Sequence, residues 1–208
     1  MIVSHKHKFI FIKTVKTAGT SIEVDLNKVL GPEDIATPIF PPVDWHSPQN
    51  FEYRKWGVLR RQLYNHMPAR DVLRIVGPRV FEDYFVFCVE REPIDKCVSH
   101  FSMIRNSPDH NSETGTLTFD EYIERAEFPV DADKYTTREG ALLVNRILRY
   151  ERLEEELREV GVELGIEISL KTRAKSGFRQ DIQLSPAQKE KIYRAFSTSN
   201  NFTGYTLQ

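Results

Sequence analysis

The 208-residue sequence has little cysteine and no excess of charge of either sign. Its two cysteines, Cys88 and Cys97, form no CxxC pair and no Cys/His cluster, so a reduced, cytoplasmic compartment is the simplest interpretation. The 29 lysines and arginines against 30 aspartates and glutamates leave a formal net charge of −1, which argues against nucleic-acid binding through bulk electrostatic attraction. Any polyanion that the protein binds must therefore meet a local site.

Long apolar runs and metal-site patterns are also missing. The run from Phe9 to Ile12, which follows a basic opening segment, is far too short for a signal peptide or a membrane span. The sequence contains no HExxH, EF-hand or clustered Cys/His pattern. With 40% hydrophobic residues the chain can still bury a substantial core, and we expect one soluble domain over residues 1–208.

The predicted elements alternate between strands and helices. The segment Phe9 to Ile12 predicts a short buried strand, and a tight loop and a helical pattern follow it. The continuous apolar run from Tyr84 to Val89 is typical of a strand in a parallel sheet covered on both faces, and the apolar spacing from Ile94 to Arg105 fits a helix. We therefore expect an α/β fold of three layers, with a central, mainly parallel sheet flanked by helices and ligands at the carboxyl ends of the strands.

Further helices are indicated by local signals. Residues 68–76 predict a short helix with proline near its first turn. Thr118 and Ser185 each begin a capping-box spacing, which predicts helices through about residues 126 and 196. Residues 141–164 fit one long helix or a helix broken around 148–151, and periodicity does not choose between the two.

The first polar loop, Lys16 to Ser21, lies between the first predicted strand and the start of a helix, and we call it the first motif. Backbone N–H groups at a helix N-terminus point the same way and carry partial positive charge, Gly19 permits close approach, and Lys16 adds a full charge. These features together suit a phosphate group. The alternative is that Thr20 or Ser21 merely caps the helix and that Lys16 is a solvated surface lysine. Because the lysine precedes the glycine, the P-loop pattern GxxxxGK[ST] is absent, which weakens an ATPase or GTPase interpretation.

The second polar loop, Arg91 to Ser99, follows the second predicted strand, and we call it the second motif. Arginine offers a planar fork of donors, and the serine about two helical turns later offers a hydroxyl, so both suit a second phosphate. The alternative pairs Arg91 with Glu92, Asp95 or another carboxylate and leaves Ser99 as an incidental helix residue. For the second motif taken alone, this alternative is the more economical one.

Together the two motifs resemble the sulfotransferases that use 3′-phosphoadenosine-5′-phosphosulfate (PAPS), particularly the Golgi carbohydrate type and its small bacterial relatives. Residues Phe9 to Glu23 resemble the family's 5′-phosphosulfate loop, and Tyr84 to Arg105 resemble its strand and 3′-phosphate motif, of the form R-x-P-x-D-K/R-x-x-S. The segment Ile147 to Leu153 is similar to the family's late strand and the start of its helix. The resemblance implies a P-loop-like fold and a single sulfotransferase domain over residues 1–208.

The resemblance also implies a reaction and its participants. A sulfuryl group would move from PAPS to a hydroxyl or amine acceptor, with 3′-phosphoadenosine 5′-phosphate (PAP) as product and no metal required. Lys16 would be catalytic, because it neutralises charge on the departing nucleotide, and Arg91 and Ser99 would hold the 3′-phosphate. Arg179, in a late basic loop, would be a further cofactor contact. The 5′-phosphate would be bound at the first motif, by Lys16, Thr17, Ala18, Gly19, Thr20 and Ser21.

The acceptor needs a base, and histidine is the natural candidate because its ordinary pKa lies near neutrality. His66 is the first choice, because the segment around it is similar to the family's short segment that carries the catalytic histidine; the alternative is that it caps or packs. His46, in the proline-rich surface loop of residues 31–50, is the second choice. The other histidines lie in a frayed basic terminus, in a helix and in a polar loop, and they are His5, His7, His100 and His110.

Three positions depart from the family pattern. Val15 stands where the family usually has proline, which predicts a less rigid start of the loop because valine keeps its N–H group. Lys13 stands where histidine is frequent, and Glu92 where many relatives have asparagine. The carboxylate of Glu92 would weaken cofactor binding unless it points away or pairs with a base.

Two other functions stay open. A nucleotide-binding module that keeps both motifs but has lost transfer is one, and an ATP-dependent P-loop kinase, disfavoured by the missing GK[ST], is the other. The resemblance implies a nucleotide cosubstrate and a hydroxyl-bearing acceptor as partners. It does not choose between a carbohydrate, a lipid and a small molecule as acceptor.

Overall fold

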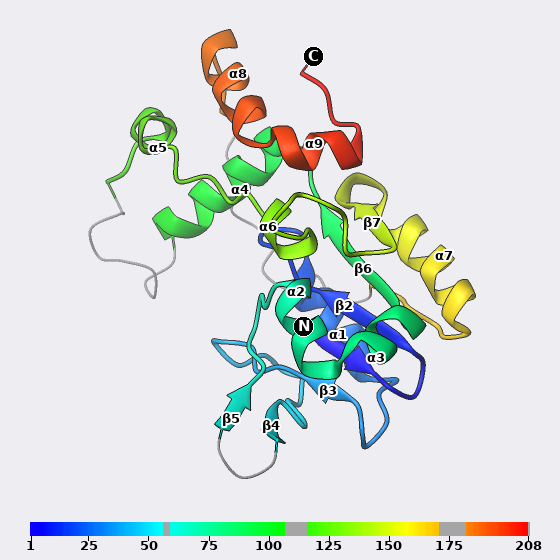
Figure 1. The fold of residues 1–208 in the computed structure, drawn as a ribbon. Coiled ribbons are helices and arrows are strands. Elements are labelled where there is room, and N and C mark those ends of the chain that lie inside the picture. The colour runs from blue at the N-terminus through cyan, green and yellow to red at the C-terminus, as the bar shows by residue number, and fades with distance from the viewer. Residues whose placement is uncertain (56–58, 107–115, 171–181, 208) are drawn as a thin grey trace.

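A five-stranded sheet forms the centre of the fold (Figure 1). The computed structural model describes residues 1–55, 59–106, 116–170 and 182–207. Strand β2 pairs in parallel with β6, and β6 in parallel with β7, whereas β1 runs antiparallel to β2 and β3, so only β1 opposes the other four. The predicted mainly parallel sheet is thereby confirmed. In spatial order the strands are β3 (Ile35–Ala36), β1 (Ile2–Ser4), β2 (Phe9–Ile12), β6 (Phe85–Glu90) and β7 (Arg146–Arg149).

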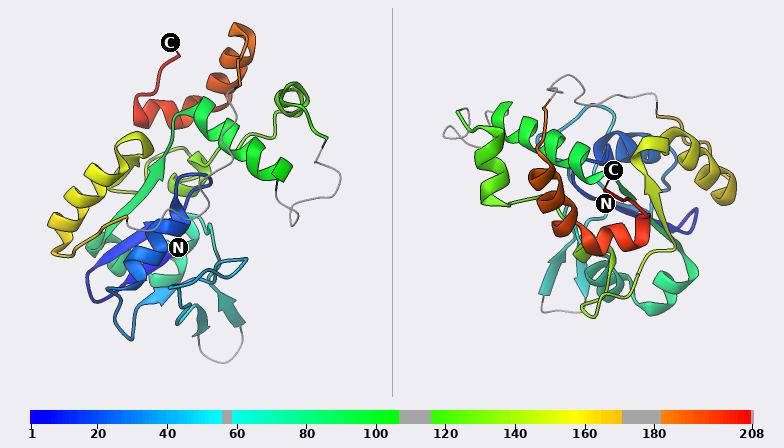
Figure 2. Two further views of the ribbon diagram at one scale, coloured as in Figure 1. Left: turned by 180° about the vertical axis from the view of Figure 1, so that it is seen from behind. Right: turned by 90° about the horizontal axis from the view of Figure 1, so that it is seen from above.

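Helices cover both faces of the sheet, which confirms the predicted three layers (Figure 2). Successive side chains of a strand point to opposite faces, so Phe9 and Phe11 face one layer while Ile10 and Ile12 face the other. The first face packs against α1 (Gly19–Asn27) and α7 (Leu153–Leu164). The second packs against α2 (Ala69–Val76), α3 (Pro78–Asp83) and α6 (Ala132–Tyr135).

A separate group of helices lies beyond the carboxyl end of β6 (Figure 1). It has its own buried cluster around Phe101, Tyr122 and Phe196. Complete capping boxes begin two of its helices, at Thr118 and Ser185, as the sequence predicts. The group contains α4 (Pro93–Asn106), α5 (Phe119–Arg125), α8 (Pro186–Ala195) and α9 (Ser197–Thr203).

Two predictions about local structure were wrong. Residues 141–164 are not one helix or a broken helix, because β7 and a 3-10 turn, Tyr150–Arg152, precede α7. The amino-terminal segment is not frayed, because β1 pairs with β2. The His5 imidazole shares a hydrogen bond with the Tyr84 hydroxyl, and the His7 imidazole donates one to the Val29 carbonyl.

Residues 31–50 are mostly irregular, as their prolines predict, with one exception. Ile35–Ala36 forms the short edge strand β3. Further along the chain, β4 (Glu52–Lys55) pairs antiparallel with β5 (Leu59–Gln62), and the two make a separate two-stranded sheet.

Asp34 joins the turn between β1 and β2 to the loop after α1. Its fully buried carboxylate accepts hydrogen bonds from the Ser4 hydroxyl at 2.7 Å and from the amides of His5, Lys6 and Gly31 at 2.7, 3.0 and 2.9 Å. Burial alone would raise the pKa of Asp34, but the four hydrogen bonds outweigh it and hold the pKa below its ordinary value. Asp34 is therefore an ionised carboxylate that holds together the β1–β2 turn and the loop after α1.

Replacing Asp34 by alanine should lower the free energy of unfolding by about 2 to 3 kcal/mol at neutral pH, because several buried donors lose their acceptor. A carboxylate with a depressed folded pKa contributes stability that is present above its unfolded pKa and is lost as the pH falls through its folded pKa. The difference between wild type and Asp34→Ala should therefore shrink below about pH 4. Denaturant titrations at several pH values measure it.

Asp83→Ala is the matched control, because the side chain of Asp83 is 62% exposed and pairs with the exposed Lys8. It should cost less than about 1 kcal/mol. A loss in Asp34→Ala that stays constant down to the acid limit of folding would show that ionisation of Asp34 does not contribute.

Candidate functional site

The first motif lies a short distance after β2 and includes the first residues of α1. Two of its residues have left-handed backbone conformations, Lys16 with φ 60° and Ala18 with φ 59°. Such angles are uncommon for residues other than glycine and mark a loop held in shape by its surroundings. No side chain caps α1 at Ala18, and the first turn has no acidic residue. The amino end of α1 therefore presents backbone N–H groups without a carboxylate that would repel an anion.

The hydroxyl groups of the first motif have different surroundings. Thr17 is fully buried, and its Oγ1 lies 2.8 Å from Oγ1 of Thr14, which in turn donates to the Val89 carbonyl. The Thr17 side chain therefore holds the loop to β6, and only its backbone remains for an anion. Ser21 is buried as well, whereas Thr20 is half-buried.

Gly19 is explained by packing. A Cβ at Gly19 would lie 2.6 Å from Cγ of Lys13, so any other residue would collide with the stem of that buried lysine. The ammonium of Lys13 lies 2.6 Å from Oε2 of the buried Glu23 on α1. Where the sulfotransferases that the sequence resembles frequently have histidine, this chain thus has a lysine paired with a carboxylate inside the protein.

The second motif contacts the first. Because β2 and β6 are neighbours in the sheet, Arg91 at the end of β6 reaches the loop, and its Nη1 donates to the Lys16 carbonyl at 3.1 Å. The guanidinium also donates through Nε and Nη2 to Asp95, at 2.7 and 2.6 Å, and lies 4.0 Å from the centroid of the Tyr150 ring. The pairing with Asp95 is the alternative that the sequence left open. Arg91 is thus oriented by a carboxylate, an aromatic ring and the first motif at once.

The carboxylate of Glu92, in the second motif, has hydrogen-bond partners within the protein. It accepts hydrogen bonds from the amides of Ile94 and Asp95 at 3.0 and 2.7 Å and from the Tyr193 hydroxyl at 2.8 Å. Glu92 therefore caps the start of α4, which is a favourable place for a negative charge. Ser99 lies half-buried in the second turn of the same helix.

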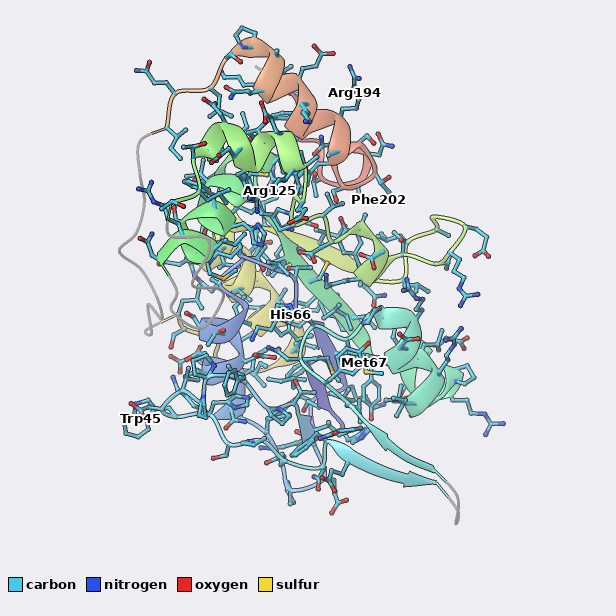
Figure 3. The ribbon with its side chains drawn as sticks, turned by 90° about the vertical axis from the view of Figure 1, so that its left-hand side faces the viewer. Trp45, His66, Met67, Arg125, Arg194 and Phe202 are labelled. Carbon is cyan, nitrogen blue, oxygen red and sulfur yellow. The ribbon has the colours of Figure 1, made fainter. Side chains whose placement is uncertain are left out.

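His66 precedes the buried Met67 (Figure 3) and contacts the short segment that joins β2 to the first motif. Its Nδ1 is 3.2 Å from the Lys13 carbonyl. A carbonyl can only accept, so Nδ1 carries the proton of the neutral ring and Nε2 keeps a lone pair. Burial, and next the positive charge of Lys13, lower the pKa of His66 to about 4. His66 is thus a neutral imidazole whose Nε2 can accept a proton.

His46 shares part of this environment. Burial, the amino-terminal charge and Lys13 lower its pKa to about 4, and its Nε2 is buried without a hydrogen-bond partner among the described residues. Its neighbour Trp45 lies at the edge of the molecule with 82% of its surface exposed (Figure 3). In contrast to His46, the ring of His66 is hydrogen-bonded to the backbone, at the Lys13 carbonyl.

The remaining predicted histidines lie elsewhere. His100 contacts the Tyr122 hydroxyl in the separate group of helices, at 3.1 Å. His5 and His7 lie in the turn before β2, at the opposite edge of the sheet from the first motif. His110 and the predicted cofactor contact Arg179 lie outside the described residues.

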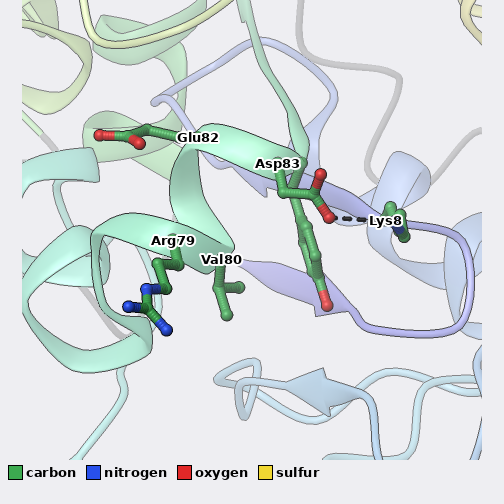
Figure 4. Close-up of a pocket in the computed structure, with 6 residues that line it drawn as sticks. Lys8, Arg79, Val80, Glu82 and Asp83 are labelled. Atoms are coloured by element: carbon green, nitrogen blue, oxygen red, sulfur yellow. Dashed lines mark hydrogen bonds and ion pairs between the residues drawn. The ribbon is translucent and has the colours of Figure 1, made fainter.

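An open pocket lies near the amino ends of β2 and β6, away from the two motifs (Figure 4). Its polar side chains include Lys8 and Asp83, which form an ion pair at 2.9 Å with both side chains more than 60% exposed. The lining is completed by Arg79, Val80, Glu82 and Tyr84. Both motifs lie at the other ends of these strands, so this pocket is not part of the candidate site.

Sequence reasoning missed the buried charges behind the two motifs. Glu23, Glu90, Lys96 and Asp131 are all less than 2% exposed. Lys96 stands at the K/R position of the second motif, and this was the only signal for its role. Asp131 gave no signal, because its partner Val15 is 116 residues away in sequence.

The ring of His66 should stay neutral down to about pH 5, since its pKa lies at about 4. Long-range proton–nitrogen NMR spectra of labelled protein should show Nδ1 protonated and Nε2 unprotonated through this range. A titration midpoint near the ordinary value of 6.5, or the opposite tautomer, would contradict the environment described for His66.

Among the described residues no helix is long and apolar enough to cross a membrane, and no group of three or more His, Cys, Asp and Glu side chains is placed to hold a metal ion. No protein-family model matches the chain.

In structure, the chain is similar to the crystal structure of mouse sulfotransferase SULT7A1 complexed with PAP. The TM-score is 0.43 and the sequence identity 14%, over 99% of this chain and 69% of that chain. In sequence, it is similar to a protein of Archaeoglobus fulgidus described as an uncharacterized protein. The two are 30% identical over 124 residues, which cover 55% of this chain and 98% of the archaeal protein. The chain belongs to the same family as this archaeal protein.

Proposed function

We propose that the protein is a sulfotransferase that uses PAPS and transfers its sulfuryl group to an acceptor hydroxyl or amine. The observation that carries the proposal is the contact of Arg91 with the Lys16 carbonyl, which makes one site of two motifs 75 residues apart. Each motif alone has an ordinary structural explanation. Two donor-rich loops in contact at neighbouring strand ends suit a ligand with two phosphate groups.

The 5′ end of the nucleotide would bind at the first motif. The backbone N–H groups from Thr17 to Ser21 would donate to the 5′-phosphate, helped by the partial positive charge at the amino end of α1. Lys16 would stabilise the negative charge that develops on the leaving nucleotide. Lys16 and Ala18 have left-handed backbone conformations in this loop, and a loop held in such a shape by its surroundings would need little reorganisation to bind an anion.

The 3′-phosphate would bind at the second motif, to Arg91 and Ser99. Arg91 is already paired with Asp95, so the phosphate would share the guanidinium with that carboxylate or displace it from one edge. A phosphate dianion competes well for a guanidinium that offers several donors. The ring of Tyr150 and the Lys16 carbonyl would keep Arg91 in place during this exchange.

The chemistry that PAPS supplies is a sulfuryl group on a good leaving group. Nε2 of His66 would take the proton of the acceptor as the acceptor oxygen bonds to sulfur and the bond from sulfur to the phosphate oxygen breaks. The Lys13 carbonyl fixes the tautomer that leaves Nε2 available. The transfer resembles phosphoryl transfer, in which positioning and charge stabilisation supply most of the catalysis.

A nucleotide-binding module without transfer is the second candidate, and one observation favours it. A histidine with a pKa of about 4 is a weak base, which would limit proton transfer at neutral pH. The two candidates share the nucleotide site and differ only in turnover.

Calorimetry without magnesium should show that PAP binds at least about 10-fold more tightly than ADP, because only PAP has a 3′-phosphate for Arg91. Arg91→Ala should weaken PAP by about 10- to 100-fold and remove most of this preference. Arg74→Ala is the control, because Arg74 pairs with Asp71 on the surface of α2. Equal affinities of the wild type for PAP and ADP, or a magnesium requirement, would instead favour an ATP-type site.

His66→Ala should lower turnover at least about 100-fold while changing the Kd of PAP less than about 3-fold, because the base acts on the acceptor and not on the nucleotide. The assay follows PAP release from PAPS over a panel of alcohols, phenols, amines and sugars. His46→Ala tests the other candidate, and His7→Asn, at the opposite edge of the sheet, is the control. Unchanged turnover in His66→Ala would remove this residue from the role of base, and PAP binding without release over the whole panel would favour the binding module.

A further inference from the structure

Asp131 is a buried charge near the candidate site, and its carboxylate has three hydrogen-bond donors around it. Its Oδ2 accepts a hydrogen bond from the Val15 amide at 2.6 Å and one from the Lys96 ammonium at 2.8 Å. Its Oδ1 accepts from Lys134 on α6. The side chain of Asp131 is fully buried, so water does little to weaken its hydrogen bonds.

The contact with Val15 acts directly on the first motif. Val15 precedes Lys16, which has a left-handed backbone and whose carbonyl receives Arg91. A proline in place of Val15 would fix this part of the loop through its ring but would have no N–H. Here the N–H of Val15 is bonded to a carboxylate, which is a strong, directed hydrogen bond. The less rigid loop start expected from the sequence is therefore countered by a bond from a distant segment.

Lys96 extends the connection to the second motif. Its fully buried ammonium lies 2.8 Å from Asp131 and 2.7 Å from Oε2 of Glu90, the residue that ends β6 directly before Arg91. A continuous chain of contacts thus runs from Val15 through Asp131 and Lys96 to Glu90. It joins the backbone of one motif to the residue beside the arginine of the other.

We propose that Asp131 is a positioning residue that holds the first motif in its anion-binding shape through the Val15 amide and ties it to the second motif through Lys96. The inference rests on the proposed function for the identity of the ligand, a nucleotide with 5′- and 3′-phosphates. Asp131 itself touches no ligand. It acts by keeping the loop amides aligned before the ligand binds.

The first test needs no variant. In the wild-type protein the Val15 amide should exchange with deuterium far more slowly than an open loop amide, and its proton resonance should lie downfield because the acceptor is charged. A Val15 amide that exchanges at the rate of an unstructured peptide would overturn the inference.

The second test compares Asp131→Asn with the matched control Asp133→Asn, which removes the same charge from an exposed side chain two residues away. In Asp131→Asn, deuterium uptake of residues 14–19 should rise at least about 10-fold, and the Kd of PAP should rise about 10-fold. Asp133→Asn should change neither. Both are measured at a temperature at which circular dichroism shows each variant folded.

A third test separates an effect on the loop from a general loss of stability. In a double-mutant cycle, Asp131→Asn should change the free energy of PAP binding less than half as much in the Lys16→Ala background as in the wild type. The reason is that a displaced loop weakens PAP binding less when the Lys16 contact is already missing. Additive effects would show that Asp131 does not act through the first motif. If Asp131→Asn does not fold, the exchange rate of the wild-type Val15 amide decides.

Failure of the inference differs from failure of the proposed function. If wild type binds PAP and Asp131→Asn binds it equally well with an unchanged loop, the inference falls and the sulfotransferase proposal stands. If wild type binds no PAP, the proposed function falls. The anchoring by Asp131 is then judged by deuterium uptake of residues 14–19 alone, and unchanged uptake in Asp131→Asn overturns it.

Discussion

The parallel pairing of β2 with β6 is the constraint on which the candidate site depends. Ile12 lies opposite Cys88 in this pair, so the chain leaves both strands at the same edge of the sheet within two residues of each other. The first motif follows one strand and the second motif follows the other. A shift of register by one residue would turn the buried side chains of either strand to the wrong face. The hydrophobic pattern that buries Phe9 and Phe87 in one layer therefore also fixes the distance between the two motifs.

The sequence was sufficient for elements whose signals are local. The run Phe9–Ile12 is a strand with the predicted bounds, and helix α2 begins and ends within a residue of its prediction. Both capping boxes are present because their partners are only three residues apart. In the segment 141–164 local periodicity was misleading. Of the residues in β7 only Leu148 is buried, so the strand shows no strong alternation of buried and exposed residues. The similarity of residues 147–153 to the late strand of the sulfotransferases did indicate a strand at this place.

Contacts between distant segments could not be predicted. Polar residues within the second motif gave a choice of partners for Arg91, and the structure selects Asp95, four residues away on α4. The bond from Val15 to Asp131 spans 116 residues, and neither residue belongs to a pattern that announces the other. Charges buried below 2% exposure are rare unless paired, so a sequence alone indicates neither that Lys96 is buried nor which carboxylates surround it.

Paired charges also decide how this site can attract an anion. Lys13 is paired with Glu23, Arg91 with Asp95, and Lys96 with Glu90 and Asp131, so a neighbouring carboxylate offsets much of the positive charge of each of these three cations. This agrees with a chain whose formal net charge is −1. A phosphate would instead be held by aligned backbone N–H groups and by exchange of partners at Arg91, both of which act over hydrogen-bond distances. Recognition of this kind depends on the shape of the loop more than on its charge. Pairing with carboxylates weakens the long-range attraction of these cations for an anion. The same buried ion pairs hold the loop in its shape.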